Sequence, residues 1–210
     1  MEKICIVGAG GFGREVLCLI LDMYNFPSEQ AKDFFCFAET DSVWKKRDVN
    51  GIPVISLSEF NSRTHKVVIA IGSPVEREKI TQMLPANTRY ATVIHPSVVM
   101  SKWVEIGEGS VICAGTILTC NIKLGKHTHL NLHTTVGHDC VTGAFFTAAP
   151  AVNISGNCSF GKNVYCGTNS SFRESLKIAN NVVIGMGAVV LKDITEQGVY
   201  VGNPLRRIEK

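Results

Sequence analysis

The sequence predicts two domains in series, an α/β domain over residues 1–95 and a parallel β-helix over residues 96–210. Three observations carry this prediction. Strand-like and helix-like segments alternate in the first half, a glycine-rich turn follows the first apolar segment, and a six-residue repeat runs through the second half. The length of 210 residues accommodates two units of about 100 residues each.

The first half alternates segments of two kinds. Residues 4–7, 34–37 and 66–71 are short apolar runs typical of buried strands, whereas residues 14–23 and 75–84 have helical spacing. Strands that alternate with helices along a chain pair in parallel, and the helices cover the faces of the sheet. The predicted fold of residues 1–95 is therefore a Rossmann-like α/β domain with a parallel sheet.

The second half is dominated by a repeat of six residues. Every sixth residue from Ile106 to Val190 is Ile, Leu, Val or Phe, with three exceptions. A glycine directly follows several repeat positions: Gly107, Gly125, Gly143, Gly161 and Gly185. We interpret these glycines as turn-permitting. Hexapeptide repeats of this kind predict a left-handed parallel β-helix, whose inward residues stack into one core.

Six residues on each of three faces place residues eighteen apart above one another, at the strand spacing of about 4.8 Å. A second inward set, mostly small or β-branched, precedes each repeat position by two residues: Val104, Ser110, Thr116, Ile122, Thr128, Thr134, Cys140, Phe146, Val152, Cys158, Val164 and Ser170. Such side chains fit a tight triangular corner. The register therefore predicts which residues lie on neighbouring rungs.

Composition narrows the class of protein. The net charge of +3 comes from scattered lysines and arginines, with no basic run that could follow a phosphate backbone, so we expect no nucleic-acid partner. The chain enters an apolar strand at once and has no apolar stretch near the roughly 20 residues that cross a bilayer. We expect a cytoplasmic protein without a membrane partner. The eight cysteines form no CxxC pair, which predicts reduced, buried side chains.

Residues 8–13 (GAGGFG) form a GxGxxG motif between a predicted strand and a predicted helix. Glycines let the backbone approach a phosphate, and the N-terminus of the helix attracts the anion. A nucleotide sugar fits best, because about 95 residues are too few for both halves of an NAD-binding domain. Glu39, after the second predicted strand, is the candidate acidic contact. A turn kept only for tight packing remains an open alternative.

His138 and Asp139 form the only histidine–carboxylate pair of neighbours in the repeat region. A neutral imidazole is the usual general base near pH 7, and a carboxylate can orient it. Gly156 lies eighteen residues further on, so we expect it one rung above His138, where its N–H could meet a thioester oxygen. The alternative is a solvated surface histidine. Cys140 is predicted to point inward, which makes it a poor nucleophile.

Three further histidines raise the question of a zinc site. His127 and His133 occupy one site on neighbouring faces and His129 occupies another, so one chain assembles no facial set of ligands. We therefore expect no metal. These three histidines, together with His65 and His95, are predicted to lie on the surface.

Taken together, several segments resemble one family. They are residues 6–15 (IVGAGGFGRE), 67–72 (VVIAIG), 95–97 (HPS), 137–140 (GHDC) and 201–204 (VGNP). The chain resembles the hexapeptide-repeat sugar acetyltransferases of the sialic-acid O-acetyltransferase and bacillosamine-pathway N-acetyltransferase type. The resemblance covers nearly the whole chain.

The resemblance implies a homotrimer with active sites between adjacent subunits, acetyl-CoA along the β-helix and a UDP- or dTDP-linked amino sugar on the N-terminal domain. His138 would be the base and Asp139 its partner. The implied coenzyme contacts are Thr147, Gly156, Thr168 and Met186. The implied nucleotide contacts are Gly11, Phe12, Gly13, Glu39, Thr40 and Gly72.

The sequence departs from this family at two places. It has Glu39-Thr40-Asp41 where many relatives have two adjacent acidic residues, and Thr147 where a histidine often follows the catalytic coil. The stretch 144–149 (AFFTAA) is also more apolar than usual. Phe145, an outward apolar residue, is predicted to lie in a subunit contact.

The predicted function is N-acetylation of the amino group of a nucleotide-linked 4-amino-deoxy sugar. The amine would attack acetyl-CoA directly, with no covalent enzyme intermediate. Two alternatives remain open: O-acetylation of a sialic-acid type acceptor, and a non-catalytic trimer that binds a nucleotide sugar.

Overall fold

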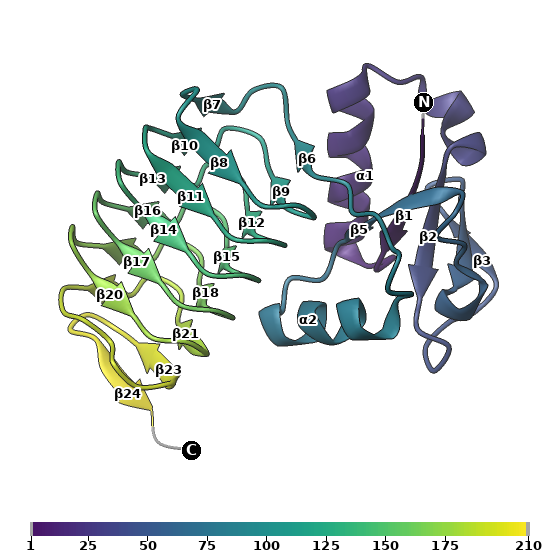
Figure 1. Ribbon diagram of the computed structural model, residues 1–210. Coiled ribbons are helices and arrows are strands. Elements are labelled where there is room, and N and C mark those ends of the chain that lie inside the picture. Colours follow the sequence, from purple (N-terminus) through teal and green to yellow (C-terminus); the bar gives the residue numbers. More distant parts are fainter. Residues whose placement is uncertain (1, 209–210) are drawn as a thin grey trace.

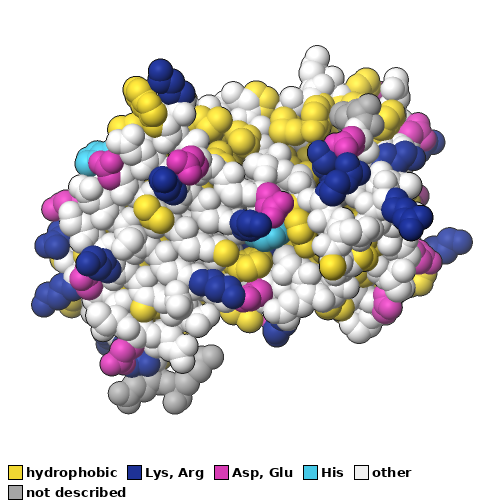
Figure 2. Space-filling view, viewed as in Figure 1, with side chains coloured by type: hydrophobic (Ala, Val, Ile, Leu, Met, Phe, Trp, Pro, Cys, Tyr) yellow, Lys and Arg dark blue, Asp and Glu magenta, His cyan; other side chains and the backbone are white. Residues whose placement is uncertain are grey.

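The structure is a computed structural model that describes residues 2–208. Figure 1 shows two parts side by side: a small sheet with its helices on the right, and a three-faced coil of short strands on the left. The predicted fold class, a parallel-sheet domain followed by a left-handed β-helix, is confirmed. Charged side chains of both signs are interspersed over the face seen in Figure 2, without a large patch of one sign.

The N-terminal sheet has the strand order β3-β4-β2-β1-β5. Its strands are β1 (Lys3–Val7), β2 (Phe35–Glu39), β3 (Arg47–Val49), β4 (Ile52–Ser56) and β5 (His65–Ile69), all parallel except β3. Its helical elements are α1 (Gly11–Tyr24), α2 (Pro74–Met83) and two short 3₁₀ segments, η1 (Ser28–Asp33) and η2 (Leu57–Glu59). The predicted strands and helices are present, and β3 and β4 were not predicted.

The boundaries of the two helices follow from local chemistry. Helix α1 begins directly after the glycine turn and ends at Asn25, whose left-handed conformation (φ 46°) lets its N–H bond to the carbonyl of Asp22. Helix α2 begins at Ser73, whose hydroxyl accepts from the N–H of Glu76, with Pro74 in the first turn. These caps fix where each helix leaves the sheet.

The coil has three faces of parallel strands. The six-stranded face contains β7 (Val99–Met100), β10 (Ile117–Leu118), β13 (Thr135–Val136), β16 (Asn153–Ile154), β19 (Ser171–Phe172) and β22 (Val189–Val190). The five-stranded face contains β8 (Val104–Ile106), β11 (Ile122–Leu124), β14 (Val141–Thr142), β17 (Ser159–Phe160) and β20 (Lys177–Ile178).

The eight-stranded face turns toward the N-terminal domain. It contains β6 (Val93–Ile94), β9 (Val111–Ile112), β12 (His129–Leu130), β15 (Thr147–Ala148), β18 (Tyr165–Cys166), β21 (Val182–Ile184), β23 (Gly198–Val201) and the antiparallel β24 (Arg206–Ile208). The predicted domain boundary at residues 95/96 falls just after β6, which already pairs with β9.

The inward residues stack as predicted. Paired strands are offset by eighteen residues, as in Thr135 opposite Asn153. The repeat positions from Ile112 to Val190 are buried, and so is the second inward set from Ser110 to Ser170. The interpretation of the repeat glycines as turn residues was wrong. A Cβ at Gly107 would come within 2.5 Å of the backbone of the next rung, so glycine is required there by close stacking.

The two domains share one core at their junction. Val93, Val111 and Cys113 of the coil pack with the apolar face of α1 and with β1 and β2. All eight cysteines are free, and six of them are buried as predicted. Cys18 of α1 is exposed, which corrects the prediction for that residue. Within residues 2–208, no helix is both long and apolar enough to cross a membrane.

Candidate active site

His138 and Asp139 lie in the turn between β13 and β14. We name these two residues, together with Asn121 and Gly156, the His138 corner. The Nδ1 of His138 lies 2.7 Å from Oδ2 of Asp139, and the His138 side chain is 57% exposed. Asp139 has a left-handed backbone (φ 60°), which turns its carboxylate back toward the imidazole. The ring therefore has one nitrogen held and the other, Nε2, accessible to a substrate.

Asn121 holds the carboxylate of Asp139, and this residue was not predicted from the sequence. Its Nδ2 donates to Oδ1 of Asp139 over 3.0 Å from one rung below. The hydrogen bond from His138, and then that from Asn121, lowers the pKa of Asp139 below its usual value. An ionised Asp139 accepts a hydrogen bond from the N–H at Nδ1, which leaves Nε2 as the proton acceptor. The eighteen-residue spacing from Asn121 to Asp139 was the signal that could have revealed it.

Gly156 lies against the His138 ring, one rung above, as the register predicts. A Cβ at this position would approach Cε1 and Nε2 of His138 to 2.6 Å. The Gly156 carbonyl accepts from Ser175, but its N–H donates no hydrogen bond within residues 2–208. A free backbone N–H beside a candidate base is the arrangement that an oxyanion requires. Its contact with a thioester remains a prediction.

Thr168 and Met186 lie at a different corner of the coil. Thr168 follows β18 and Met186 follows β21, one rung apart on the edge of the eight-stranded face. The Met186 side chain is 77% exposed. One chain thus splits the predicted coenzyme contacts between two corners. Their role remains a prediction.

Thr147 does not lie at the His138 corner, which corrects the prediction that it contacts coenzyme. Its side chain is buried, and its hydroxyl donates to the carbonyl of Gly72 over 3.1 Å and accepts from Arg77 over 2.8 Å. Thr147 is an outward residue of β15, and the N-terminal domain covers that face. The hydroxyl is therefore fully engaged inside the chain.

Phe145 and two histidines are also covered by the N-terminal domain. Phe145 is 8% exposed and stacks on His127 with 5.1 Å between ring centroids, so its predicted place in a subunit contact was wrong. His127 and His129 are buried, not on the surface as predicted. Burial, reinforced by the charge of Arg77, lowers the pKa of His127 to about 4 and that of His129 well below its usual value.

These histidines do not form a metal site. Within residues 2–208, no cluster of three or more His, Cys, Asp or Glu side chains could hold a metal ion. His127 and His129 face the N-terminal domain, and His133 lies in the exposed turn after β12.

The glycine-rich turn borders a pocket of about 360 Å³ at the carboxyl ends of β1, β2 and β5. The pocket brings together four of the predicted nucleotide contacts: Gly11, Phe12, Glu39 and Thr40. Gly13 packs behind it, because a Cβ there would lie 1.9 Å from the carbonyl oxygen of Gly8. Gly72 does not line this pocket, and its carbonyl accepts from Arg77 and Thr147.

The acidic side chains at the pocket have different environments. Glu39 accepts from Arg47 through Oε1 over 2.7 Å, while its Oε2 is buried and has no partner in the described structure. Asp41 is engaged elsewhere, since it accepts from the hydroxyl of Ser56 and the N–H of Ser58, which lowers its pKa. Of these two carboxylates, Glu39 is therefore the one with an oxygen that lacks a hydrogen-bond partner.

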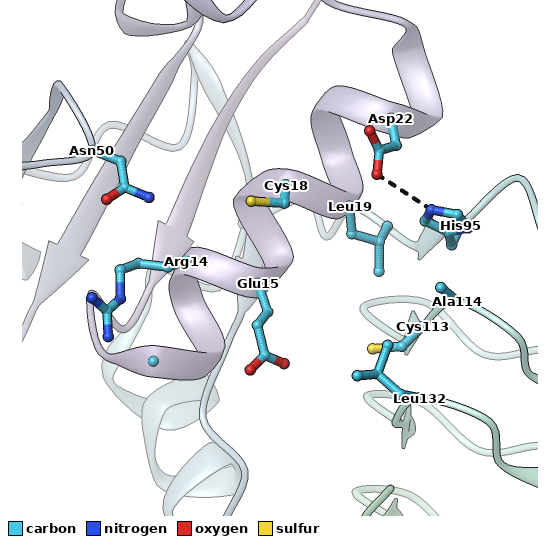
Figure 3. A pocket seen from close by; sticks show the side chains of 11 residues that line it. Arg14, Glu15, Cys18, Leu19, Asp22, Asn50, His95, Cys113, Ala114 and Leu132 are labelled. Carbon is cyan, nitrogen blue, oxygen red and sulfur yellow. Dashed lines mark hydrogen bonds and ion pairs between the residues drawn. The ribbon is translucent and has the colours of Figure 1, made fainter. Parts of the chain in front are cut away.

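A second cleft, of about 520 Å³, lies between α1 and the first rungs of the coil and shares Gly11 with the pocket at the glycine-rich turn. Figure 3 shows Arg14, Glu15, Cys18 and Asp22 along one side of α1, opposite His95. The Nε2 of His95 lies 3.3 Å from Oδ2 of Asp22. This cleft was not predicted, although the spacing of residues 14, 18 and 22 places them on one helix face.

Comparison with known proteins agrees with this arrangement. Residues 3–84 match the PglD N-terminal domain family. The whole chain is 27% identical to GDP-perosamine N-acetyltransferase of Escherichia coli O157:H7, over 98% of that protein. It is 34% identical to WeeI from Acinetobacter baumannii AYE, with a TM-score of 0.90 over 99% of this chain and 100% of that one.

The acetyltransferase domain of PglB from Neisseria gonorrhoeae FA1090 is similar as well. It is 27% identical, with a TM-score of 0.86 over 99% of this chain and 100% of that one. The same domain in complex with acetyl coenzyme A is 28% identical, with a TM-score of 0.78 over 99% of each chain. With both domains matched over their full length, this chain belongs to the hexapeptide-repeat sugar N-acetyltransferases.

Proposed function

We propose that this enzyme transfers the acetyl group of acetyl-CoA to the amino group of a nucleotide-linked amino-deoxy sugar, with His138 as general base. The observation that carries the proposal is the His138 corner. It combines an oriented imidazole, an accessible Nε2 and the free N–H of Gly156. The PglB domain solved with acetyl coenzyme A supports the donor.

The proposed reaction is a direct transfer between the two substrates at these residues. The amine nitrogen attacks the thioester carbonyl carbon, a C–N bond forms, and Nε2 of His138 takes the proton that the nitrogen loses. In the proposed mechanism, the N–H of Gly156 stabilises the oxyanion that develops. The C–S bond then breaks, and the thiolate of coenzyme A takes the proton back from His138. The products are the N-acetylated sugar and free coenzyme A.

The nucleotide pocket supports a nucleotide-linked acceptor. Its glycine turn opens helix α1, where a diphosphate is favoured, and Glu39 lines the pocket with one carboxylate oxygen that has no hydrogen-bond partner in the described structure. The family resemblance implies UDP or dTDP, while the name of the E. coli relative adds GDP as a third nucleotide to test. We propose a cytoplasmic location for this enzyme.

The coil supports a homotrimer. Outward residues of the six-stranded face are all uncharged: Val99, Ile117, Thr135, Asn153, Ser171 and Val189. The five-stranded face instead presents Glu105, Lys123 and Lys177. An uncharged flat face with exposed Val99 and Ile117 fits a contact with another copy. Such a contact would bring the His138 corner of one subunit near Thr168 and Met186 of the next.

The test is release of free thiol from acetyl-CoA with UDP-, dTDP- and GDP-linked 4-amino sugars and with sialic acid, followed by mass and NMR analysis of the product. We expect release with one of the nucleotide-linked amino sugars and an amide in the product. Release with sialic acid alone would replace N-acetylation by O-acetylation. Binding of a nucleotide sugar without any thiol release would identify a non-catalytic binding trimer.

A further inference from the structure

We infer that His129 and Thr147, two outward residues of the coil, act with Arg77 as positioning residues for the two loops that form the nucleotide pocket. The first loop is the glycine-rich turn with Phe12. The second is the turn after β5, with Ile71 and Gly72. The inference rests on the proposed nucleotide binding and adds a cause for the shape of that pocket.

Arg77 of α2 is completely buried and has no carboxylate partner in the described chain. Its guanidinium donates six hydrogen bonds, two to the β5–α2 turn and four to the coil. The acceptors are the carbonyls of Ile71 (2.7 Å), Gly72 (3.3 Å), His127 (3.0 Å), Phe145 (3.0 Å) and Phe146 (3.1 Å), and the hydroxyl of Thr147 (2.8 Å). A planar fork with five N–H groups can satisfy such a set, and a lysine cannot.

The coil contacts both loops from neighbouring rungs. His129 and Thr147 are paired residues on β12 and β15, and both point outward from the eight-stranded face. The His129 ring lies 5.2 Å from the ring of Phe12, between centroids. The Thr147 hydroxyl donates to Gly72 and accepts from Arg77.

His129 contacts one loop and Thr147 contacts the other. Because these two residues are one strand spacing apart on the coil, that spacing sets the distance between the loops. Phe12 and Ile71 both line the nucleotide pocket. Loops on the surface of an α/β domain are mobile unless something holds them. Here the coil holds both loops. The hydroxyl of Thr147 is the smallest group in these contacts that a substitution can remove.

A second contact between the domains provides a matched control. Glu78 of α2 pairs with Lys162, and it accepts from Asn163 over 2.7 Å. The Lys162 side chain is 47% exposed, and none of these three residues lines the nucleotide pocket. We expect loss of this pair to loosen the junction at its edge without changing that pocket.

The test uses the full chain with Thr147→Val, Thr147→Ser and Lys162→Ala, because Arg77→Ala would strand several buried carbonyls and could prevent folding. Calorimetry measures binding of UDP, dTDP, GDP and acetyl-CoA, and thermal unfolding measures stability. We expect Thr147→Val to weaken nucleotide binding by about 5- to 10-fold, the scale of one lost hydrogen bond, with acetyl-CoA binding unchanged. Thr147→Ser should restore most of the affinity, and Lys162→Ala should lower only the melting temperature.

Two outcomes would overturn the inference in distinguishable ways. If the unaltered protein binds a nucleotide and Thr147→Val binds it equally well while melting earlier, Thr147 has only a structural role. If the unaltered protein binds none of the three nucleotides, the nucleotide part of the proposed function fails, and the positioning role fails with it.

Discussion

His138, Asp139 and Gly156 show how single residues of a regular repeat acquire chemistry. The pair and the glycine one rung above could be placed from the sequence, because the eighteen-residue register converts spacing into neighbourhood. Asn121 obeys the same register, yet it was missed because asparagine is common at such turns. Thr147 was misplaced, because its neighbours belong to the other domain.

Gly156 offers a test of the His138 corner that leaves the imidazole itself intact. A methyl group at this position would collide with the His138 ring at 2.6 Å and force it away from its place. We expect Gly156→Ala to lower kcat by roughly 10- to 100-fold, on the scale of a displaced catalytic group. Steady-state kinetics would check this, with the exposed neighbour Ser155→Ala as control. Equal kcat values for both variants would contradict the proposed geometry.

At the scale of elements, the period of six predicted the coil well, because inward residues are defined by local spacing alone. The outward residues were harder to predict. His127, His129 and Phe145 occupy positions that would be exposed in an isolated coil, and only α2 and the glycine turn bury them. The repeat contains no signal for docking.

The buried histidines predict loss of stability at acidic pH. The pKa of His127 falls to about 4 in the folded chain, against an ordinary value near 6.5 when unfolded. Between these values the unfolded chain binds a proton that the folded chain does not, so stability is complete above about pH 6.5 and falls toward pH 4. The loss from His127 should be on the order of 1–3 kcal/mol.

His127→Phe should reduce this pH dependence. A phenyl ring keeps the aromatic packing on Phe145 and Tyr90 and cannot be protonated. Urea unfolding at pH 7 and pH 4.5 would show a smaller difference for this variant than for the unaltered chain. The exposed His133→Gln serves as control and should change nothing. An unchanged pH dependence in His127→Phe would mean that other groups cause the loss.

At the scale of the whole molecule, the coil has one face covered by the N-terminal domain, one charged face and one uncharged face. Phe145 did not reveal this division, because the apolar side chain taken to mark a subunit contact lies on the face that the N-terminal domain covers. The uncharged six-stranded face is the proposed subunit contact. If active sites form between subunits, dissociation should abolish activity even though each chain keeps its fold.

A single charge on that face should separate the subunits. Ile117 is exposed in the isolated chain and lies between Val99 and Thr135 in the uncharged row. We expect Ile117→Asp to convert a trimer into monomers without acetyltransferase activity, because an unpaired buried charge opposes assembly. Light scattering after gel filtration measures the mass. Val141→Asp, an equally exposed position on the five-stranded face, should stay trimeric. Monomers in the unaltered protein would refute the trimer.

The central claim is that His138 removes a proton from the amine that attacks acetyl-CoA. The most direct measurement compares thiol release by the unaltered enzyme and by His138→Ala with a nucleotide-linked 4-amino sugar, alongside acetyl-CoA binding. The proposed mechanism predicts a loss of roughly 10²- to 10⁴-fold in kcat, with acetyl-CoA affinity unchanged. A variant that retains its rate, or that loses acetyl-CoA binding in parallel, would contradict a general-base role for His138.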